Sequence, residues 1–347
     1  MFNLPSGLIP DLTQAAGWMP IVFLVVMGLS MLAYVILDGY DLGVGVLMRG
    51  ANEDDKDTMI ASIGPFWDAN ETWLVLGVGI LLTVFPLAHG AILQALYLPV
   101  AFMLIGLTLR GVAFDFRVKA RAALKPLWNN AFYAGSLLAG WSQGYMLGSL
   151  ITGFDESLWT IAFNAVIGLA LVVAYCLIGA GWLIMKTVGS LQLQAVRWAQ
   201  RSLLFVVLGV GAISVATPLV SPLIFDKWFS FPNIVLLLPI PAATAVLFAV
   251  IYRSLSRLPT RLEQGNEYGA WVPFAATVGV FLLAFYGLAY SLFPWLVIEK
   301  ITIWQAATSP EALKVILIGS SVVMPVIVGY TVYAYRVFWG KSVALKY

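Results

Sequence analysis

Long stretches without a charged residue alternate with short charged segments along the chain. These charge-free runs cover residues 12–37, 72–109, 126–154, 157–185, 202–225, 228–252, 268–298 and 315–335. Each exceeds the roughly 20 apolar residues with which a helix crosses a bilayer. The second run is long enough for two crossings, and Phe85-Pro86 with the nearby His89-Gly90 offers a turn between them.

The pattern predicts an all-α integral membrane protein of nine transmembrane helices in a single domain, residues 1–347. Helices satisfy every backbone hydrogen bond within the bilayer, and alternating strand patterns are missing from the sequence. We expect the helices near residues 17–38, 72–88, 91–113, 127–150, 158–185, 198–217, 234–252, 270–292 and 314–338.

The basic residues predict the orientation of these nine spans. With the N-terminus outside and the C-terminus in the cytoplasm, 16 of the 19 Lys and Arg residues fall in inner segments. Only Lys227, Lys300 and Lys314 fall in outer segments. This distribution follows the positive-inside rule, so the helix count and the charge bias support each other.

Composition agrees with a membrane protein and excludes other classes. The chain is 61% hydrophobic and 10% charged, whereas about 25% charged is ordinary for soluble domains. Its 13 Trp, 14 Tyr and 20 Phe are the reverse of a disordered composition. The net charge of +2 gives no reason to expect a nucleic-acid partner, and a single Cys excludes a disulfide scaffold.

Two acids follow the first apolar run. Asp38 and Asp41 lie in the segment LDGYDLGVG, with Gly39, Gly43 and Gly45 around them. If the helix continues, a spacing of three places both carboxylates on one face, as a proton-accepting pair beside closely packed helices. If the helix ends at Asp38, both acids are simply solvated. The spacing leaves both interpretations open.

A second acid pair begins the next predicted helix. Asp68 and Glu71 lie in GPFWDANETWL, where Pro65 suits a helix start. Acids in a first turn complement the helix dipole and need no other role, and Trp67 is suited to an interface anchor. The polar and aromatic surroundings favour function for Asp68, whereas capping is favoured for Glu71.

The third predicted helix ends in RGVAFDFR, which contains Arg110, Asp115 and Arg117. Basic residues at an inner boundary orient a helix, and this is the favoured interpretation. The alternative is an ion pair between Arg110 and Asp38 or Asp68.

The chain is poor in ligands for a metal or haem. His89 is the only histidine, predicted at an outer turn, and Cys176 lies within an apolar helix, where it is expected to pack as a small hydrophobe. Two-histidine haem ligation is therefore impossible within this chain. We assign no catalytic, metal-binding or cofactor-binding residue, and expect any redox centre on a partner.

At these motifs the sequence resembles subunit II of the cytochrome bd-type quinol oxidases. The resemblance is carried by LDGYDLGVG (37–45), GPFWDANETWL (64–74) and RGVAFDFR (110–117), in this order and spacing. A fourth segment, TIWQAATSPEALK (302–314), is similar to the one before the family's last helix, and LYLP and WLIMKT are most similar to the cyanide-insensitive branch.

The resemblance implies a bacterial terminal oxidase of the inner membrane that oxidises quinol (ubiquinol or menaquinol) and reduces dioxygen to water. It implies a heterodimer in which subunit I carries two b-type haems and one d-type haem, with an optional small accessory subunit. The fold implied is two four-helix bundles plus a peripheral helix. Subunit II then ligates no haem, supports the haem subunit and contributes to proton uptake from the cytoplasm.

Residue by residue, the resemblance makes Asp68 the leading proton-path candidate, with Asp38, Asp41 and Glu71 beside it. Arg110 and Asp115 match the end of the third helix, and Trp67 and Arg117 remain structural or ion-pair candidates. One departure is Ala69, where many members have glycine. Two rival interpretations remain: a proton-coupled secondary transporter that works without a pigmented partner, and a purely structural subunit whose acids are caps and ion pairs.

Overall fold

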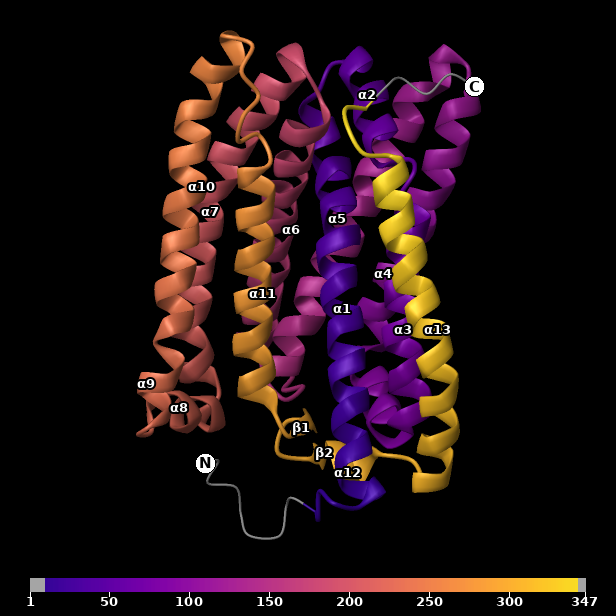
Figure 1. Ribbon diagram of the computed structural model, residues 1–347, viewed down its shortest axis with the longest axis vertical. Coiled ribbons are helices and arrows are strands. Elements are labelled where there is room, and N and C mark those ends of the chain that lie inside the picture. Colours follow the sequence, from indigo (N-terminus) through magenta and orange to yellow (C-terminus); the bar gives the residue numbers. More distant parts are fainter. Residues whose placement is uncertain (1–9, 343–347) are drawn as a thin grey trace.

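The protein folds as a bundle of long, roughly parallel helices (Figure 1). A computed structural model describes residues 10–342, so the predicted positions of the two chain ends lie outside the described residues. The helices are α1 (Ala15–Leu47), α2 (Glu53–Ile63), α3 (Trp67–Val84), α4 (Pro86–Lys119), α5 (Lys125–Ile151), α6 (Leu158–Lys186), α7 (Gly189–Val220), α8 (Pro222–Phe229), α9 (Asn233–Leu237), α10 (Pro239–Glu263), α11 (Val272–Leu292), α12 (Ile303–Ala306) and α13 (Pro310–Val337). A short antiparallel hairpin, β1 (Trp295–Val297) and β2 (Ile301–Thr302), precedes α12.

Seven of the described helices are long and apolar enough to cross a membrane: α1, α4, α6, α7, α10 with the preceding α9, α11 and α13. The protein is therefore a multi-pass membrane protein. Two further long helices, α3 and α5, run for 18 and 27 residues but are less apolar. In α3 the difference comes from the segment that holds Asp68, Asn70 and Glu71.

The helices pack in two groups that meet where α6 packs on α1 and on α5. In one group α1 packs on α3 and α5, and α4 lies along α5; in the other α6 and α10 pack on α7 and on α11. Helix α13 lies at the edge against α1 and α3, with only Leu313 and Ala334 buried (Figure 1). The chain thus forms one contiguous helical assembly with α13 at its margin.

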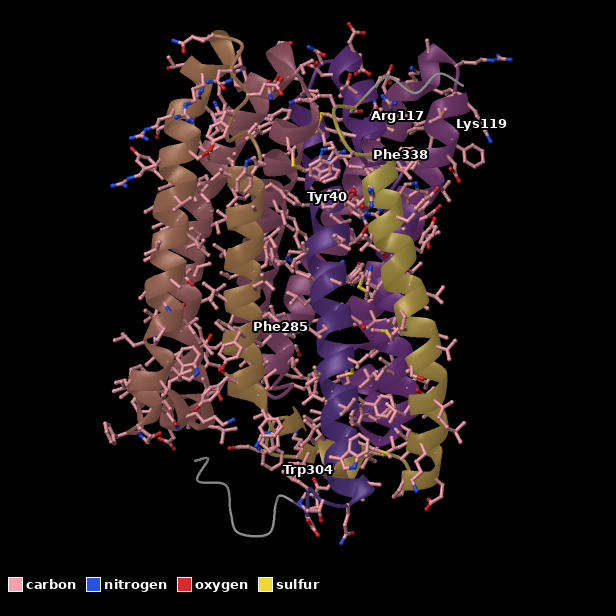
Figure 2. The ribbon with its side chains drawn as sticks, in the orientation of Figure 1. Tyr40, Arg117, Lys119, Phe285, Trp304 and Phe338 are labelled. Carbon is pink, nitrogen blue, oxygen red and sulfur yellow. The ribbon has the colours of Figure 1, made fainter. Side chains whose placement is uncertain are left out.

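The two ends of the bundle differ in composition. At one end, here called the α2 end, lie α2 and the segment from Arg117 to Lys119; at the other, the α12 end, lie the hairpin and Trp304 (Figure 2). Trp182 of α6 is buried near the α2 end, stacks on Tyr40 at 4.2 Å between ring centroids, and donates to the Ser62 carbonyl of α2. This contact holds α2 onto the bundle.

Several helices run beyond the apolar stretches from which they were predicted. Helix α1 continues past Asp38 to Leu47, because a buried and paired carboxylate does not interrupt backbone hydrogen bonding. The break between α3 and α4 falls at Phe85, as expected, but His89 and Gly90 belong to the start of α4 rather than to a turn. Pro86 occupies the first position of α4, where proline favours a helix start, so α4 begins directly after Phe85 without a longer turn.

Glycines allow the closest helix contacts. A Cβ built on Gly43 of α1 would lie 1.8 Å from the carbonyl oxygen of Tyr175 in α6. Gly106 of α4 and Gly135 of α5 face each other in the same way, with a Cβ on either one 2.6–2.8 Å from the other's carbonyl oxygen. Small residues at such crossings let backbones touch, as is typical of packed membrane helices.

We predict that Gly43→Ala destabilises the protein by about 1–3 kcal/mol or more, because its methyl group must displace the α6 backbone. Gly79→Ala in α3 is the matched control, since a Cβ there meets nothing within 4 Å. The apparent melting temperature of each purified variant measures the effect. Equal melting temperatures for Gly43→Ala and Gly79→Ala would contradict the packing described here.

Candidate functional site

A buried ionic cluster joins α1, α3 and α4 towards the α2 end. Asp38 and Asp41 of α1 are both 0% exposed, and Arg110 of α4 is 1% exposed. Arg110 Nη2 lies 2.7 Å from Asp38 Oδ1 and also pairs with Glu71 of α3, which is 29% exposed. These four residues, Asp38, Asp41, Glu71 and Arg110, are called the ionic cluster below.

The structure excludes simple solvation of the aspartate pair, because both carboxyls are buried within a continuous helix. Because α1 continues, Asp38 and Asp41 lie on neighbouring positions of one helix and are directed towards α4 and α3 through their contacts with Arg110 and Asn70. Gly39 and Gly43 pack against Tyr175 of α6 instead. Helix α1 therefore presents small residues to α6 and carboxylates to α3 and α4.

Asn70 connects Asp41 to a pair of tyrosines. Its Nδ2 donates to Asp41 Oδ2 at 2.8 Å and to the Tyr40 hydroxyl at 3.0 Å, and its Oδ1 accepts from the Tyr335 hydroxyl at 3.1 Å. The two tyrosine hydroxyls lie 2.6 Å apart. Asn70 is fully buried. Because it bonds both Asp41 and Tyr335, it connects α13 to the ionic cluster.

A second set of hydrogen bonds lies beside the cluster, towards the α12 end. Tyr34 precedes Asp38 by one turn of α1, and its hydroxyl accepts from Gln143 Nε2 at 2.7 Å. The Tyr175 hydroxyl donates to Gln143 Oε1 at 2.6 Å. Buried polar groups thus run from the α2 end into the interior across α1, α5 and α6.

The two acids of α3 differ in their surroundings. Glu71, predicted as a cap, pairs with Arg110, whereas Asp68, predicted as functional, is exposed in the first turn of α3 and has no ion pair within residues 10–342. Asp68 lies in the first turn of α3, but the N-cap residue is Phe66 and, among the described residues, no side chain makes a capping hydrogen bond there. Asp115 of α4 is also exposed.

The arginines of α4 are more than boundary markers. The less favoured expectation for Arg110, an ion pair with Asp38, is what the structure shows, while Asp68 is not its partner. The guanidinium Cζ lies 5.9 Å from the centroid of Trp67, which covers it from α3. Arg110 is thus enclosed by two carboxylates and an aromatic ring.

Arg117 belongs to a separate set of polar contacts at the α2 end. Its Nη2 lies 2.7 Å from Asp57 Oδ1, and its Nε donates to Asn129 Oδ1 at 2.5 Å. Burial raises the pKa of the Asp57 carboxyl, but hydrogen bonds from Arg117 and Lys125 outweigh it and hold that pKa below its usual value. These contacts connect α2 with α4 and α5.

Asn70, Gln143 and the two network tyrosines Tyr40 and Tyr335 were not singled out from the sequence. Asn70 and Tyr40 lie inside motifs that were recognised, so their position between paired acids was the available signal. Gln143 is the only amide side chain in the middle of the charge-free run 126–154, and this was its signal. Nothing in the sequence marks Tyr335. Its role depends on the packing of α13.

Within the described residues, no group of three or more His, Cys, Asp and Glu side chains could hold a metal ion. Cys176 is buried in α6 and His89 is half-buried in the first turn of α4. The ionic cluster offers different chemistry, because it holds three carboxyls and one guanidinium, which pairs with two of them. Full ionisation of all three would leave excess negative charge in a buried site, so the arrangement is suited to holding a proton.

Comparisons with known proteins agree on one family. The family described as "Cytochrome bd terminal oxidase subunit II" matches residues 19–338. The chain is 26% identical to cytochrome bd ubiquinol oxidase subunit 2 of Bacillus subtilis, over 91% of this chain and 95% of that protein. It is 27% identical to cytochrome bd-I ubiquinol oxidase subunit 2 of Escherichia coli K12, over 92% and 94%.

A solved structure shares the fold. The bd oxidase of Geobacillus thermodenitrificans superposes on this chain with a TM-score of 0.72 at 17% sequence identity, covering 93% of this chain and 99% of the matched one. The likeness therefore extends over nearly the whole bundle.

We predict that Arg110→Gln lowers the free energy of unfolding by about 3–5 kcal/mol, because it leaves buried carboxylates without a counter-charge. Adding Asp38→Asn should restore part of the loss, since the double variant removes both charges of the pair. Arg121→Gln, an exposed arginine at the same end, is the control. The ion pair would be contradicted if the decrease in melting temperature of the double variant equalled the sum of the decreases of the two single variants.

Proposed function

This chain belongs to the cytochrome bd terminal oxidase subunit II family, and from that membership we propose that it supports the haem subunit and takes part in cytoplasmic proton uptake. The chain is a subunit of a quinol oxidase complex, an oxidoreductase. We propose the bacterial inner membrane as its location and a heterodimer with the haem-bearing subunit I as its assembly, with room for a small accessory subunit. The names of the relatives favour ubiquinol over menaquinol as the electron donor.

The proposed topology has nine spans in two four-helix bundles with α13 peripheral. Helices α3 and α5 join the seven apolar helices, because α3 packs along α1 and α5 packs along α4 and α6. The positive-inside rule then places the α2 end in the cytoplasm, where Arg117 and Lys119 lie (Figure 2). The carboxylates of the ionic cluster would open to that side.

We assign the haems, two b-type and one d-type, to the partner subunit. The residues of this chain do not fit two-histidine haem ligation, because His89 in the first turn of α4 is its only histidine and Cys176 is packed in α6. The haems would supply electron transfer and dioxygen reduction. This chain's own residues hold or move protons and stabilise the assembly.

The observation that carries proton uptake is the excess of carboxylates over bases in the ionic cluster. Reduction of dioxygen to water consumes protons, and a route from the cytoplasm needs titratable groups that continue inwards from the surface. Asp68 and Asp115 are exposed near the α2 end, Glu71 is partly exposed, and Asp38 and Asp41 are fully buried. We propose that protons enter at Asp68 and reach the aspartate pair through Glu71.

A structural role for the same acids is the second candidate. The pairing of Arg110 with Asp38 and Glu71 favours it, because buried ion pairs fix helix positions whether or not protons move. Proton-coupled transport by this chain alone finds no support in the relatives, which are oxidase subunits.

The test compares the intact complex carrying Asp68→Asn or Glu71→Gln with the wild type. Glu263→Gln, at an exposed acid of the same end, is the control. We expect the first two to slow quinol oxidation and proton uptake at least tenfold, within the range of general acid–base effects, with the haem spectrum preserved. The control should match the wild type. Turnover and proton uptake are measured together, with a pH dye inside reconstituted vesicles.

The outcomes separate the two candidates. Normal turnover with a lowered melting temperature in Glu71→Gln supports the structural role and contradicts proton conduction through Glu71. Unchanged turnover and proton uptake in Asp68→Asn would overturn the assignment of Asp68.

A further inference from the structure

A cavity of about 540 Å³ lies at the α2 end, away from the ionic cluster. Arg49 lines it from the connection between α1 and α2, and Lys56 lines it from α2. Asn129, Asn130 and Tyr133 line it from the first turns of α5. It is called the basic cavity below. None of the residues that line it belongs to the proposed proton path.

The lining of the basic cavity carries two positive charges and no carboxylate. Lys56 is partly neutralised, because its Nζ lies 2.7 Å from Glu53 Oε1, which is outside the lining. The other oxygen of Glu53 accepts from Asn129 Nδ2 at 3.0 Å. Arg49 has no carboxylate within 4.0 Å anywhere in residues 10–342, so the cavity keeps a net positive charge.

Arg49 is held in a defined position although it lacks an acidic partner. Its Cζ lies 5.1 Å from the centroid of the Tyr133 ring, a cation–π contact. The residue is exposed and forms no ion pair within residues 10–342, so its N–H groups can reach an acceptor. A planar fork with free donors matches the oxygens of a phosphate group.

The second base is unusual for a residue that only orients a membrane helix. The Lys56 side chain is 14% exposed, so most of its length is buried beside the cavity. Asn129 is 95% buried by the same measure of exposure (5% exposed) and is held by Arg117 and Glu53. Orientation requires only exposed bases such as Arg121, whereas here fixed polar groups surround a space.

We infer that the basic cavity is a binding site for a phosphate group. Arg49 supplies the bidentate contact, Lys56 a second positive charge, and Asn130 an amide at the open side. Under the proposed orientation the cavity lies at the level of the inner-leaflet headgroups, so an anionic phospholipid is the nearest source of that group. A free phosphate is the other source of the same chemistry.

The test titrates the delipidated complex with phosphatidylglycerol, phosphatidylcholine or inorganic phosphate and counts bound molecules by native mass spectrometry. We expect Arg49→Gln to weaken phosphatidylglycerol binding at one site about tenfold or more, the size of a lost charged hydrogen bond. Lys56→Gln should weaken it less, because Lys56 already pairs with Glu53. Arg121→Gln is the matched control and should bind as the wild type does.

Each result bears on the site alone, because lipid binding is measured without turnover. Competition by millimolar inorganic phosphate would identify a free phosphate rather than a headgroup as the occupant. Equal phosphatidylglycerol affinity in wild type, Arg49→Gln and Lys56→Gln would overturn the inference. Should Arg49→Gln not yield a monodisperse complex, Arg49→Lys keeps the charge, loses the fork, and is expected to bind with intermediate affinity.

Discussion

The ion pair between Arg110 and Asp38 is the interaction on which the α2 half of the bundle depends. Both groups are removed from solvent, so neither is tolerated without the other. Arg110 reaches Glu71 as well, and this makes one guanidinium the common contact of α1, α3 and α4. The relative positions of these three helices follow from the need to keep that charge paired.

Close packing on the other side of α1 complements this requirement. Gly43 lets α1 touch the backbone of α6, and Trp182 stacks on Tyr40 to fill the space at the same level. Helix α1 cannot move away from Arg110 without opening the contact with α6. Charge on one face and steric fit on the other therefore fix the same helix, and the polar network through Asn70 attaches α13 to it.

Apolar runs were sufficient to predict a helical membrane protein, and the motifs were sufficient to find Asp38, Asp41, Glu71 and Arg110. They did not assign partners, because an ion pair between α1 and α4 joins residues 72 positions apart and depends on how the helices cross. The same limit applies to Asp68 and Glu71, of which only Glu71 pairs with Arg110. Both have the spacing of first-turn acids, and only the position of α4 shows which one meets an arginine.

Exposure differs among the members of the ionic cluster in a way that bears on proton movement. Asp38, Asp41 and Arg110 are enclosed, whereas Glu71 is 29% exposed and touches the guanidinium. Glu71 therefore connects a buried charge to the protein surface directly. A structural ion pair would be satisfied by Arg110 with one aspartate, so the additional buried carboxyl of Asp41 is what the structural role leaves unexplained. Asp41 is hydrogen-bonded to Asn70 and has no basic partner within residues 10–342, so under the proposed proton uptake this carboxyl would be the group that accepts the proton.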